Sequence, residues 1–265
     1  MRYGIACMSR CPPHLEDWIH YHEQIGFLYI YLRLEGPSCR LMQKVISERF
    51  PSLVRVLEEG VGPFFSDQVE RQSFFVETAI EKAHQDRVDR LLHIDDDELF
   101  SFSSSWSKES ESIGSFHFQN VEAVYPEDST MKQCFQRTNQ FRDCRRETCR
   151  SYGNGKSMLL LPSAEKPFGV HYFTGNHQSV DPSHARILHF ESCDLSMWIQ
   201  KFSEGSFSES VFPFYRQSWQ VVQDHVPCKT STCMADLEQM YRNSTGPRPQ
   251  EQLTTYTVYP PRRIT

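Results

Sequence analysis

The stretch that decides the fold runs from residue 91 to residue 100 and reads LLHIDDDELF. Its first half belongs to an apolar segment over 90–94, which predicts a short buried strand. Four adjacent carboxylates follow at once, Asp95, Asp96, Asp97 and Glu98, before apolar sequence resumes at Leu99. A solvated acidic run rarely lies between two buried segments, so the pattern predicts carboxylates gathered at the tip of a strand.

Upstream of this stretch, apolar segments of strand length alternate with segments of helical period. Strands are predicted over 3–8, 27–32, 53–57 and 90–94, and helices over 14–24, 41–49 and 67–85. Such alternation is typical of a parallel α/β sheet, and right-handed crossovers place the helices on both faces. We therefore expect an α/β protein with a Rossmann-like, mostly parallel central sheet flanked by helices.

Beyond residue 100 the pattern is looser. The Ser-rich segment 101–112 predicts a loop from which Trp106 packs back onto the body. Residues 114–125 alternate, 156–161 and 187–190 read as strands, and 194–202 reads as a helix. Pro and Arg dominate from Gly246 onward, which predicts an extended tail.

Composition excludes several classes of protein. The chain has 265 residues, 28 Lys and Arg against 34 Asp and Glu, and a formal net charge of −6, so no broad basic field for nucleic acid is expected. The longest apolar run, Ile25 to Leu32, is far shorter than the roughly 20 residues that span a bilayer. Arg10 and two prolines interrupt the N-terminal segment, which therefore does not resemble a signal peptide. We expect a soluble, cytoplasmic protein.

Nine cysteines are scattered over the chain, and none of their loose pairs has the two-residue spacing of a zinc knuckle. Reduced thiols are the expectation in a cytoplasmic protein. The sequon that begins at Asn243 has meaning only if the chain enters the secretory route.

The acidic run itself indicates a hard divalent cation. Mg²⁺ and Mn²⁺ prefer oxygen ligands, and they commonly keep only one or two carboxylates in addition to substrate phosphates. Asp95 and Asp97 alternate, so both can face one side if the chain is still extended there. The alternative is that 95–98 form a solvated N-cap and first helical turn, where acidic residues are also favoured.

The same stretch resembles the strand followed by D-x-D-E-F of glycosyltransferases with the GT-A fold. The sequence LEDWIHYH over 15–22, the Ile25-Gly26-Phe27 that follows it and the YIY over 29–31 are similar to the family-2-like group that includes the glycosyltransferase family 92 domain. Later elements also match: GKSM over 155–158, His171 and ARILHF over 185–190. The resemblance spans about residues 3–202 and is loose over 101–150. Two loops depart from the pattern, at Ser9-Arg10 and at 33–35, and both usually touch the nucleotide.

The resemblance implies a hexosyl- or pentosyltransferase that moves a sugar from a nucleotide-sugar to a hydroxyl of a glycan or glycoprotein acceptor. UDP-sugars are favoured and GDP-sugars are possible donors. It also implies one GT-A-like domain over 1–245, with a nucleotide-sugar half over about 1–100, an acceptor half over about 101–245 and a tail over 246–265. No membrane span and no nucleic-acid partner are expected.

The resemblance further implies a Mn²⁺ or Mg²⁺ ion held by Asp95 and Asp97, which would neutralise the leaving diphosphate. His189 is the expected additional metal ligand, with His171 the second choice. Catalytic roles are expected for Asp97 and for a base, either Glu191 or Asp128; Glu122 and Glu127 are weaker candidates. The expected nucleotide-sugar contacts are Ser9, Arg10, Glu35, Arg71, Asp95 and Lys156.

Two other functions remain open at this point. A metal-dependent phosphodiester or sugar-phosphate hydrolase would also use Asp95, Asp97 and a histidine, although it usually needs more ligands for a second ion. A non-catalytic module that binds a sugar nucleotide would keep the fold and lose the reaction.

Overall fold

The computed structural model describes residues 1–35, 39–57, 68–103, 106, 114–126, 133–144, 150–204, 213–225 and 231–258. These residues fall into two compact units, and each is described by itself. The described part of unit 1 lies within Met1–Gln119 and Asn154–Ile187, and that of unit 2 within Asn120–Gly153 and Leu188–Pro260.

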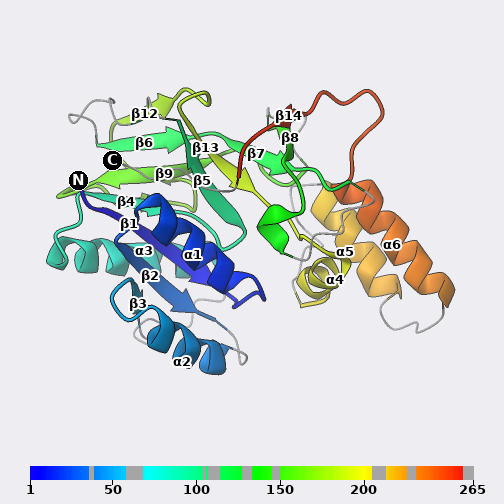
Figure 1. The fold of residues 1–265 in the computed structure, drawn as a ribbon, viewed down its shortest axis with the longest axis horizontal. Coiled ribbons are helices and arrows are strands. Elements are labelled where there is room, and N and C mark those ends of the chain that lie inside the picture. Colours follow the sequence, from blue (N-terminus) through cyan, green and yellow to red (C-terminus); the bar gives the residue numbers. More distant parts are fainter. Residues whose placement is uncertain are drawn as a thin grey trace. The chain divides into compact units, whose positions relative to one another are not determined.

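Unit 1 is built on a seven-stranded sheet with the order β12-β6-β9-β4-β1-β2-β3 (Figure 1). Strands β3, β2, β1 and β4 are parallel, β9 is antiparallel to both β4 and β6, and β12 is parallel to β6. The mostly parallel sheet and the four predicted N-terminal strands are therefore confirmed. The strands are β1 (Tyr3–Ser9), β2 (Tyr29–Leu34), β3 (Val54–Val56), β4 (Arg90–His93), β6 (Ser115–Phe118), β9 (Lys156–Leu160) and β12 (His177–Val180).

The three predicted N-terminal helices form as α1 (Leu15–Ile25), α2 (Cys39–Arg49) and α3 (Gln68–Gln85). Helix α1 ends at Gly26, whose φ of 109° is in the left-handed region that glycine adopts without strain. Its N–H donates to the carbonyl of Glu23 at 3.0 Å and so satisfies one of the last carbonyls of the helix.

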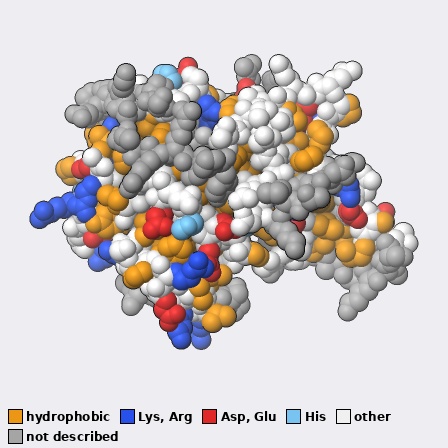
Figure 2. All heavy atoms as spheres, viewed as in Figure 1, with side chains coloured by type: hydrophobic (Ala, Val, Ile, Leu, Met, Phe, Trp, Pro, Cys, Tyr) orange, Lys and Arg blue, Asp and Glu red, His pale blue; other side chains and the backbone are white. Residues whose placement is uncertain are grey.

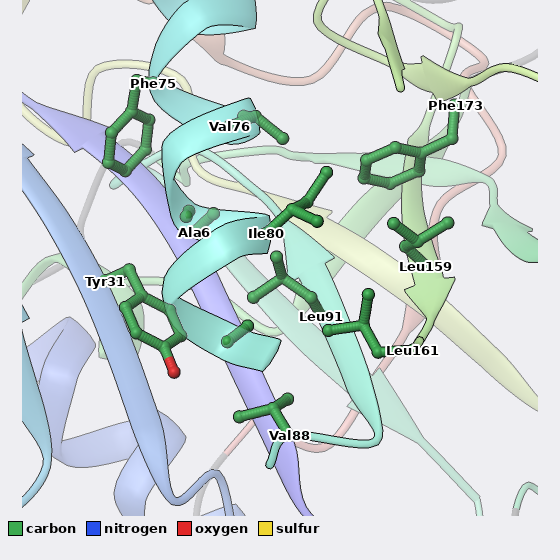
Figure 3. Close-up of a cluster of buried hydrophobic side chains, with 12 residues drawn as sticks. Ala6, Tyr31, Phe75, Val76, Ile80, Val88, Leu91, Leu159, Leu161 and Phe173 are labelled. Atoms are coloured by element: carbon green, nitrogen blue, oxygen red, sulfur yellow. The ribbon is translucent and has the colours of Figure 1, made fainter. Parts of the chain in front are cut away.

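Helix α3 covers one face of the sheet. Its buried residues recur at helical spacing, so they form one apolar stripe. Figure 3 shows this stripe against side chains of β1, β2, β4 and β9. The cluster consists of Ala6, Tyr31, Phe75, Val76, Ala79, Ile80, Ala83, Val88, Leu91, Leu159, Leu161 and Phe173.

The remaining elements of unit 1 are β5 (Glu98–Phe102) and the hairpin of β10 (Pro167–Phe168) with β11 (Tyr172–Phe173). Strand β13 (Ala185–His189) neighbours β5; its residues up to Ile187 belong to unit 1 and the rest to unit 2. The loop predicted over 101–112 is wrong at its first two residues, which belong to β5. Trp106 packs back as predicted: it is 1% exposed, with edge-to-face contacts to Phe100, Phe116 and Phe118.

Unit 2 combines an antiparallel sheet with three helices. Strand β8 (Gln140–Asp143) pairs with β7 (Asn120–Ala123) and with β14 (Thr254–Thr255). A short 3-10 helix spans Cys134–Gln136. Helices α4 (Leu195–Glu204), α5 (Pro213–His225) and α6 (Ser231–Thr245) pack around the buried Trp198 and Phe202. Of these helices, only α4 was predicted.

The expectation of reduced thiols is wrong for five cysteines of the described part of the chain. Disulfides join Cys11 to Cys39 in unit 1 and Cys134 to Cys193 in unit 2. Cys233 is also disulfide-bonded, whereas Cys7 is a buried free thiol. The pairing was not predictable because nine cysteines allow many connectivities.

None of the helices in the described part of the chain combines the length and the apolar character that crossing a bilayer needs. On the face drawn in Figure 2, acidic and basic side chains are interspersed among the coloured residues.

Burial of a histidine ties the stability of unit 1 to pH. Burial lowers the pKa of His22 to about 3, and its ring bonds the Trp18 carbonyl and the Phe100 N–H. Below pH 6.5 His22 is protonated in the unfolded chain but stays neutral in the folded chain. Its contribution to stability is therefore fully present above pH 6.5 and is lost as the pH falls toward 3. One such group contributes a slope of at most about 1.4 kcal/mol per pH unit.

We expect His22→Gln to lower the slope of unfolding free energy against pH by up to about 1.4 kcal/mol per pH unit, the contribution of one proton. The Gln amide keeps polar atoms in place but does not titrate in this range. The free energy of unfolding, measured in urea between about pH 4 and pH 7, gives the slope. His20→Gln, on the exposed face of the same helix, is the control and should keep the wild-type slope. Equal slopes in both variants would contradict the assignment to His22.

Candidate functional site

The four carboxylates lie on a tight connection between β4 and β5 in unit 1. Strand β4 ends at His93, the chain turns at Asp96 and Asp97, and the N–H of Glu98 donates to the Asp95 carbonyl at 3.2 Å. The predicted position at the end of a strand is confirmed. The extended chain that would put Asp95 and Asp97 on one side is not found, and neither is the alternative first helical turn, because a strand follows.

Lys156, the first residue of β9, places its ammonium group inside this acidic turn. Its Nζ lies 2.5 Å from Asp95 Oδ2 and 3.5 Å from Glu98 Oε2. The Lys156 and Glu98 side chains are buried, and the Asp95 side chain is 30% exposed. Burial alone would lower the pKa of Lys156, but Asp95 and Glu98 outweigh it and raise that pKa. Lys156, expected as a nucleotide-sugar contact, is therefore a buried partner of the acidic turn.

Asp95 is held from several sides. Its Oδ1 accepts a hydrogen bond from Gln72 of α3 at 3.1 Å, and its own N–H donates to Glu98 Oε2 at 2.7 Å. Burial would raise the pKa of Asp95, but Lys156 dominates and the pKa is lowered. Asp95 is thus an ionised carboxylate with a fixed orientation.

Asp96 and Asp97 have different surroundings. Asp96 accepts a hydrogen bond from Ser9 Oγ at 2.6 Å, and its carbonyl lies 3.1 Å from His14 Nε2. Burial, with Asp97 adding to it, raises the pKa of Asp96 to about 7. Asp97, the second residue of the turn, is partly exposed.

The sheet edge that carries this turn also carries other predicted contact residues. Glu35 follows β2, and its N–H donates to the carbonyl of Ser9 at the end of β1 at 2.8 Å. Arg71 of α3 forms a two-pronged ion pair with Glu35 at 3.1 and 3.3 Å. Since β1, β2 and β4 are parallel, their carboxyl ends meet at one edge of the sheet, which is where ligands bind in open α/β sheets. Arg10 is exposed.

Gly155, immediately before β9, has a backbone conformation and a close contact that suit glycine. Its φ is +65°, and a Cβ there would lie 2.0 Å from the carbonyl oxygen of Phe118. The Gly155 carbonyl also lies 2.8 Å from Nδ1 of His171, whose pKa is lowered to about 4, first by burial and then by Lys156. The close backbone approach at Gly155 is therefore to the last residue of strand β6.

In unit 2, His189 ends β13, and its Nε2 lies 3.6 Å from Oε2 of the buried Glu191. Glu191 also accepts hydrogen bonds from Lys201 Nζ at 2.6 Å and from the Tyr215 hydroxyl at 3.0 Å. Glu122 forms a buried ion pair with Arg142 at 2.9 Å.

The predicted site residues thus come from both units. Unit 1 brings Ser9, Glu35, Arg71, Asp95, Asp97 and Lys156 to the carboxyl edge of the parallel strands and also contains Arg10, whereas His189 and Glu191 belong to unit 2. Asp128 and Glu127 lie outside the described residues. Sequence reasoning missed Gln72, Arg142, Lys201 and Tyr215. Helical spacing could have placed Gln72 on the buried stripe of α3, but the other three carry no local signal.

No family model matches the sequence, and no curated protein matches it. Two solved structures are similar to the fold at a low level. HddC from Yersinia pseudotuberculosis is 12% identical, with a TM-score of 0.36 over 71% of this chain and 93% of that one. A mannose-1-phosphate geranyltransferase from Thermus thermophilus is 10% identical, with a TM-score of 0.31 over 92% of this chain and 68% of that one. At these TM-scores neither carries an argument about this chain.

We expect Lys156→Met to destabilise the protein by about 3–5 kcal/mol, because it leaves Asp95 and Glu98 beside each other without the buried cation. The measurement is the free energy of unfolding in urea. Lys44→Met is the matched control at an exposed lysine that pairs with Glu48 at 3.9 Å, and its effect should stay within about 0.5 kcal/mol. A Lys156 variant as stable as the control would contradict the structural role given to the ion pair.

Proposed function

We propose that the protein is a GT-A-like glycosyltransferase that moves a sugar from a nucleotide-sugar to a hydroxyl of a glycan acceptor with the help of Mn²⁺ or Mg²⁺. The observation that carries the proposal is the acidic turn after β4, at the carboxyl edge of four parallel strands. There Asp95 is fixed by Lys156 and Gln72, while Asp97 is partly exposed. The likeness of LLHIDDDELF to the family element supports the same function.

The donor set of the turn fits a hard cation. Carboxylate oxygens are the ligands that Mg²⁺ and Mn²⁺ prefer, and one or two of them are sufficient when substrate phosphates complete the shell. Because Lys156 and Gln72 already engage both oxygens of Asp95, Asp97 is the carboxylate that we assign to direct metal contact, with Asp95 as its oriented neighbour. The role of His189 as an additional ligand stays a prediction.

When bound, the metal would neutralise the charge that develops on the departing nucleoside diphosphate. Of the chain's own residues, Arg10 and Arg71 would hold the donor, because their guanidinium groups suit phosphate oxygens. Ser9 is buried and its hydroxyl donates to Asp96, so it would position the turn rather than contact the donor. Arg71 is preset by its ion pair with Glu35. Lys156 keeps Asp95 ionised, so the turn retains negative charge at neutral pH. Glu191 or Asp128 stays the proposed base for the acceptor hydroxyl.

The proposal is tested by thermal shift with UDP- and GDP-sugars, each with and without Mn²⁺. A ligand at about 100 times its Kd should add about 2.7 kcal/mol of stability, and the gain should require Mn²⁺. We expect Asp97→Asn to lose the metal-dependent part. Asp17→Asn, a partly buried acid on α1, is the control and should keep it.

Transfer to an acceptor hydroxyl is then measured with the sugar donor that stabilises the protein. Release of free sugar that added acceptors do not affect would favour the hydrolase instead. Binding without any turnover would favour the non-catalytic module. Full transfer by Asp97→Asn would contradict the assignment of Asp97.

The disulfides bear on the compartment in which the protein works. The sequence predicts a cytoplasmic location, where disulfides are rare. Disulfides persist mainly in oxidising compartments, so the pairs Cys11–Cys39 and Cys134–Cys193 favour the secretory lumen or the cell exterior. Asn243 of the sequon is exposed on α6, so its position permits glycosylation there.

We expect non-reducing peptide mapping of the purified protein to recover Cys11 linked to Cys39. The double variant Cys11→Ser with Cys39→Ser should lose about 3–4 kcal/mol of stability, because the bond closes a segment with a sequence separation of 28. Cys7→Ser is the control for a buried thiol without a disulfide and should leave the mapped pair intact. Recovery of both cysteines as free thiols would argue for a reducing compartment.

A further inference from the structure

His189 in unit 2 has both ring nitrogens beside polar groups, although its side chain is only 2% exposed. Its Nδ1 lies 3.2 Å from the hydroxyl oxygen of Ser151. Its Nε2 lies 3.6 Å from Oε2 of Glu191. A neutral imidazole carries one hydrogen, so the partner of each nitrogen decides which one is protonated.

The chain of hydrogen bonds behind Ser151 settles the direction. Burial would raise the pKa of Glu122, but Arg142 outweighs it and the pKa is lowered, so Glu122 is an ionised carboxylate that can only accept. The Ser151 hydroxyl donates its single hydrogen to Glu122 Oε1 at 2.7 Å. The Ser151 oxygen is then an acceptor toward Nδ1 of His189, which must carry the imidazole hydrogen.

Glu122 is itself held firmly, so the direction of this chain is fixed. Its Oε1 also accepts the Ser151 N–H at 3.0 Å, and its Oε2 accepts Arg142 Nη1 at 2.9 Å. Arg142 is locked in turn by two hydrogen bonds to Glu251, at 2.6 and 3.0 Å, and one to the Gly246 carbonyl at 3.2 Å. The Arg142 and Glu122 side chains are both buried, at 2% and 3% exposure.

With the hydrogen on Nδ1, the lone pair of His189 lies on Nε2. Glu191 Oε2, at 3.6 Å, is also an acceptor, and it is held in place by the Tyr215 hydroxyl at 3.0 Å. Lys201 engages the other oxygen of Glu191 at 2.6 Å. Two acceptor atoms facing each other in a buried setting repel unless a proton or a metal cation lies between them, and imidazole nitrogen with carboxylate oxygen is a common ligand pair for transition metals such as Mn²⁺.

We infer that Ser151 is a positioning residue: the relay Arg142–Glu122–Ser151 fixes His189 as the Nδ1–H tautomer, so that His189 Nε2 and Glu191 Oε2 together present a two-ligand seat for a divalent cation. This arrangement assigns Glu191 a ligand role in place of a base role. The identity of the cation rests on the proposed function, whereas the tautomer does not.

The tautomer is read directly from the imidazole ¹⁵N resonances of the full chain, labelled on histidine and free of metal at alkaline pH. His189→Gln identifies the signals by their loss. We expect Nδ1 in the range of a protonated nitrogen and Nε2 in the range of a bare one. In Ser151→Ala this preference should be lost, and in Ser151→Thr, which keeps the hydroxyl, it should be retained.

Ser218→Ala is the matched control. Ser218 is a fully buried serine of the same unit whose hydroxyl has no hydrogen-bond partner among the described residues. This substitution should leave the His189 resonances unchanged. An Nε2–H tautomer or a doubly protonated ring in the wild type would overturn the inference, as would identical spectra for Ser151→Ala and Ser218→Ala.

The seat is tested separately by titrating the same variants with Mn²⁺ alone and following the free ion by electron paramagnetic resonance. We expect Ser151→Ala to bind about 10- to 100-fold more weakly, as for other substitutions behind a metal-bound histidine, with Ser151→Thr and Ser218→Ala close to wild type. Equal affinity in Ser151→Ala and Ser218→Ala would overturn the ligand role. The predicted tautomer with no Mn²⁺ binding by the wild type would keep the relay, overturn the seat and count against the metal-dependent function.

Discussion

The buried ammonium group of Lys156 is the interaction on which unit 1 depends. Four acidic side chains lie at the short connection between β4 and β5, and their mutual repulsion would destabilise the turn without a cation among them. Lys156 supplies that cation from β9, the strand that lies between β4 and β6. A buried ion pair of this kind is weak evidence for net stability, since burying both charges costs about as much as their attraction returns. Its value lies in geometry, because it fixes which carboxylate points where.

In both units a buried basic side chain orients an acidic side chain. In unit 1 a lysine orients Asp95, and in unit 2 an arginine orients Glu122. In each case a basic side chain with almost no solvent exposure keeps an acidic one ionised, and a neutral hydrogen-bonding residue extends the network, Gln72 in one and Ser151 in the other. Networks of this kind hold polar atoms rigidly, which is what ligand binding and proton transfer require.

The features that depend on local sequence could be predicted. The strand–helix alternation of the first hundred residues and the acidic strand tip follow from apolar period and from turn residues such as Gly26, so they were predicted with small errors at the ends. The partner of Asp95 was not predictable, because Lys156 lies 61 positions away and only the topology of the sheet brings them together. The conformation of 95–97 was missed for a related reason: the hydrogen bond from the Glu98 N–H to the Asp95 carbonyl turns the chain, and no propensity indicates it. The networks of unit 2 depend on contacts between segments more than a hundred residues apart, such as that of Arg142 with Glu251.

Strand β9 has a consequence for how the chain is completed during synthesis. It separates β4 from β6 in the sheet, yet the first segment of unit 2, Asn120–Gly153, precedes it along the chain. When only β1 to β6 have been synthesised, the strand that separates β4 from β6 is still absent, and the acidic turn lacks Lys156. Because chains emerge at about 5–20 residues per second, the nascent protein spends several seconds in this state before residue 156 follows. The sheet of unit 1 therefore cannot be completed while only the first hundred residues are available. At that stage the edges of β4 and β6 that later pair with β9 are unpaired, and such edges are sites for chaperone binding or aggregation.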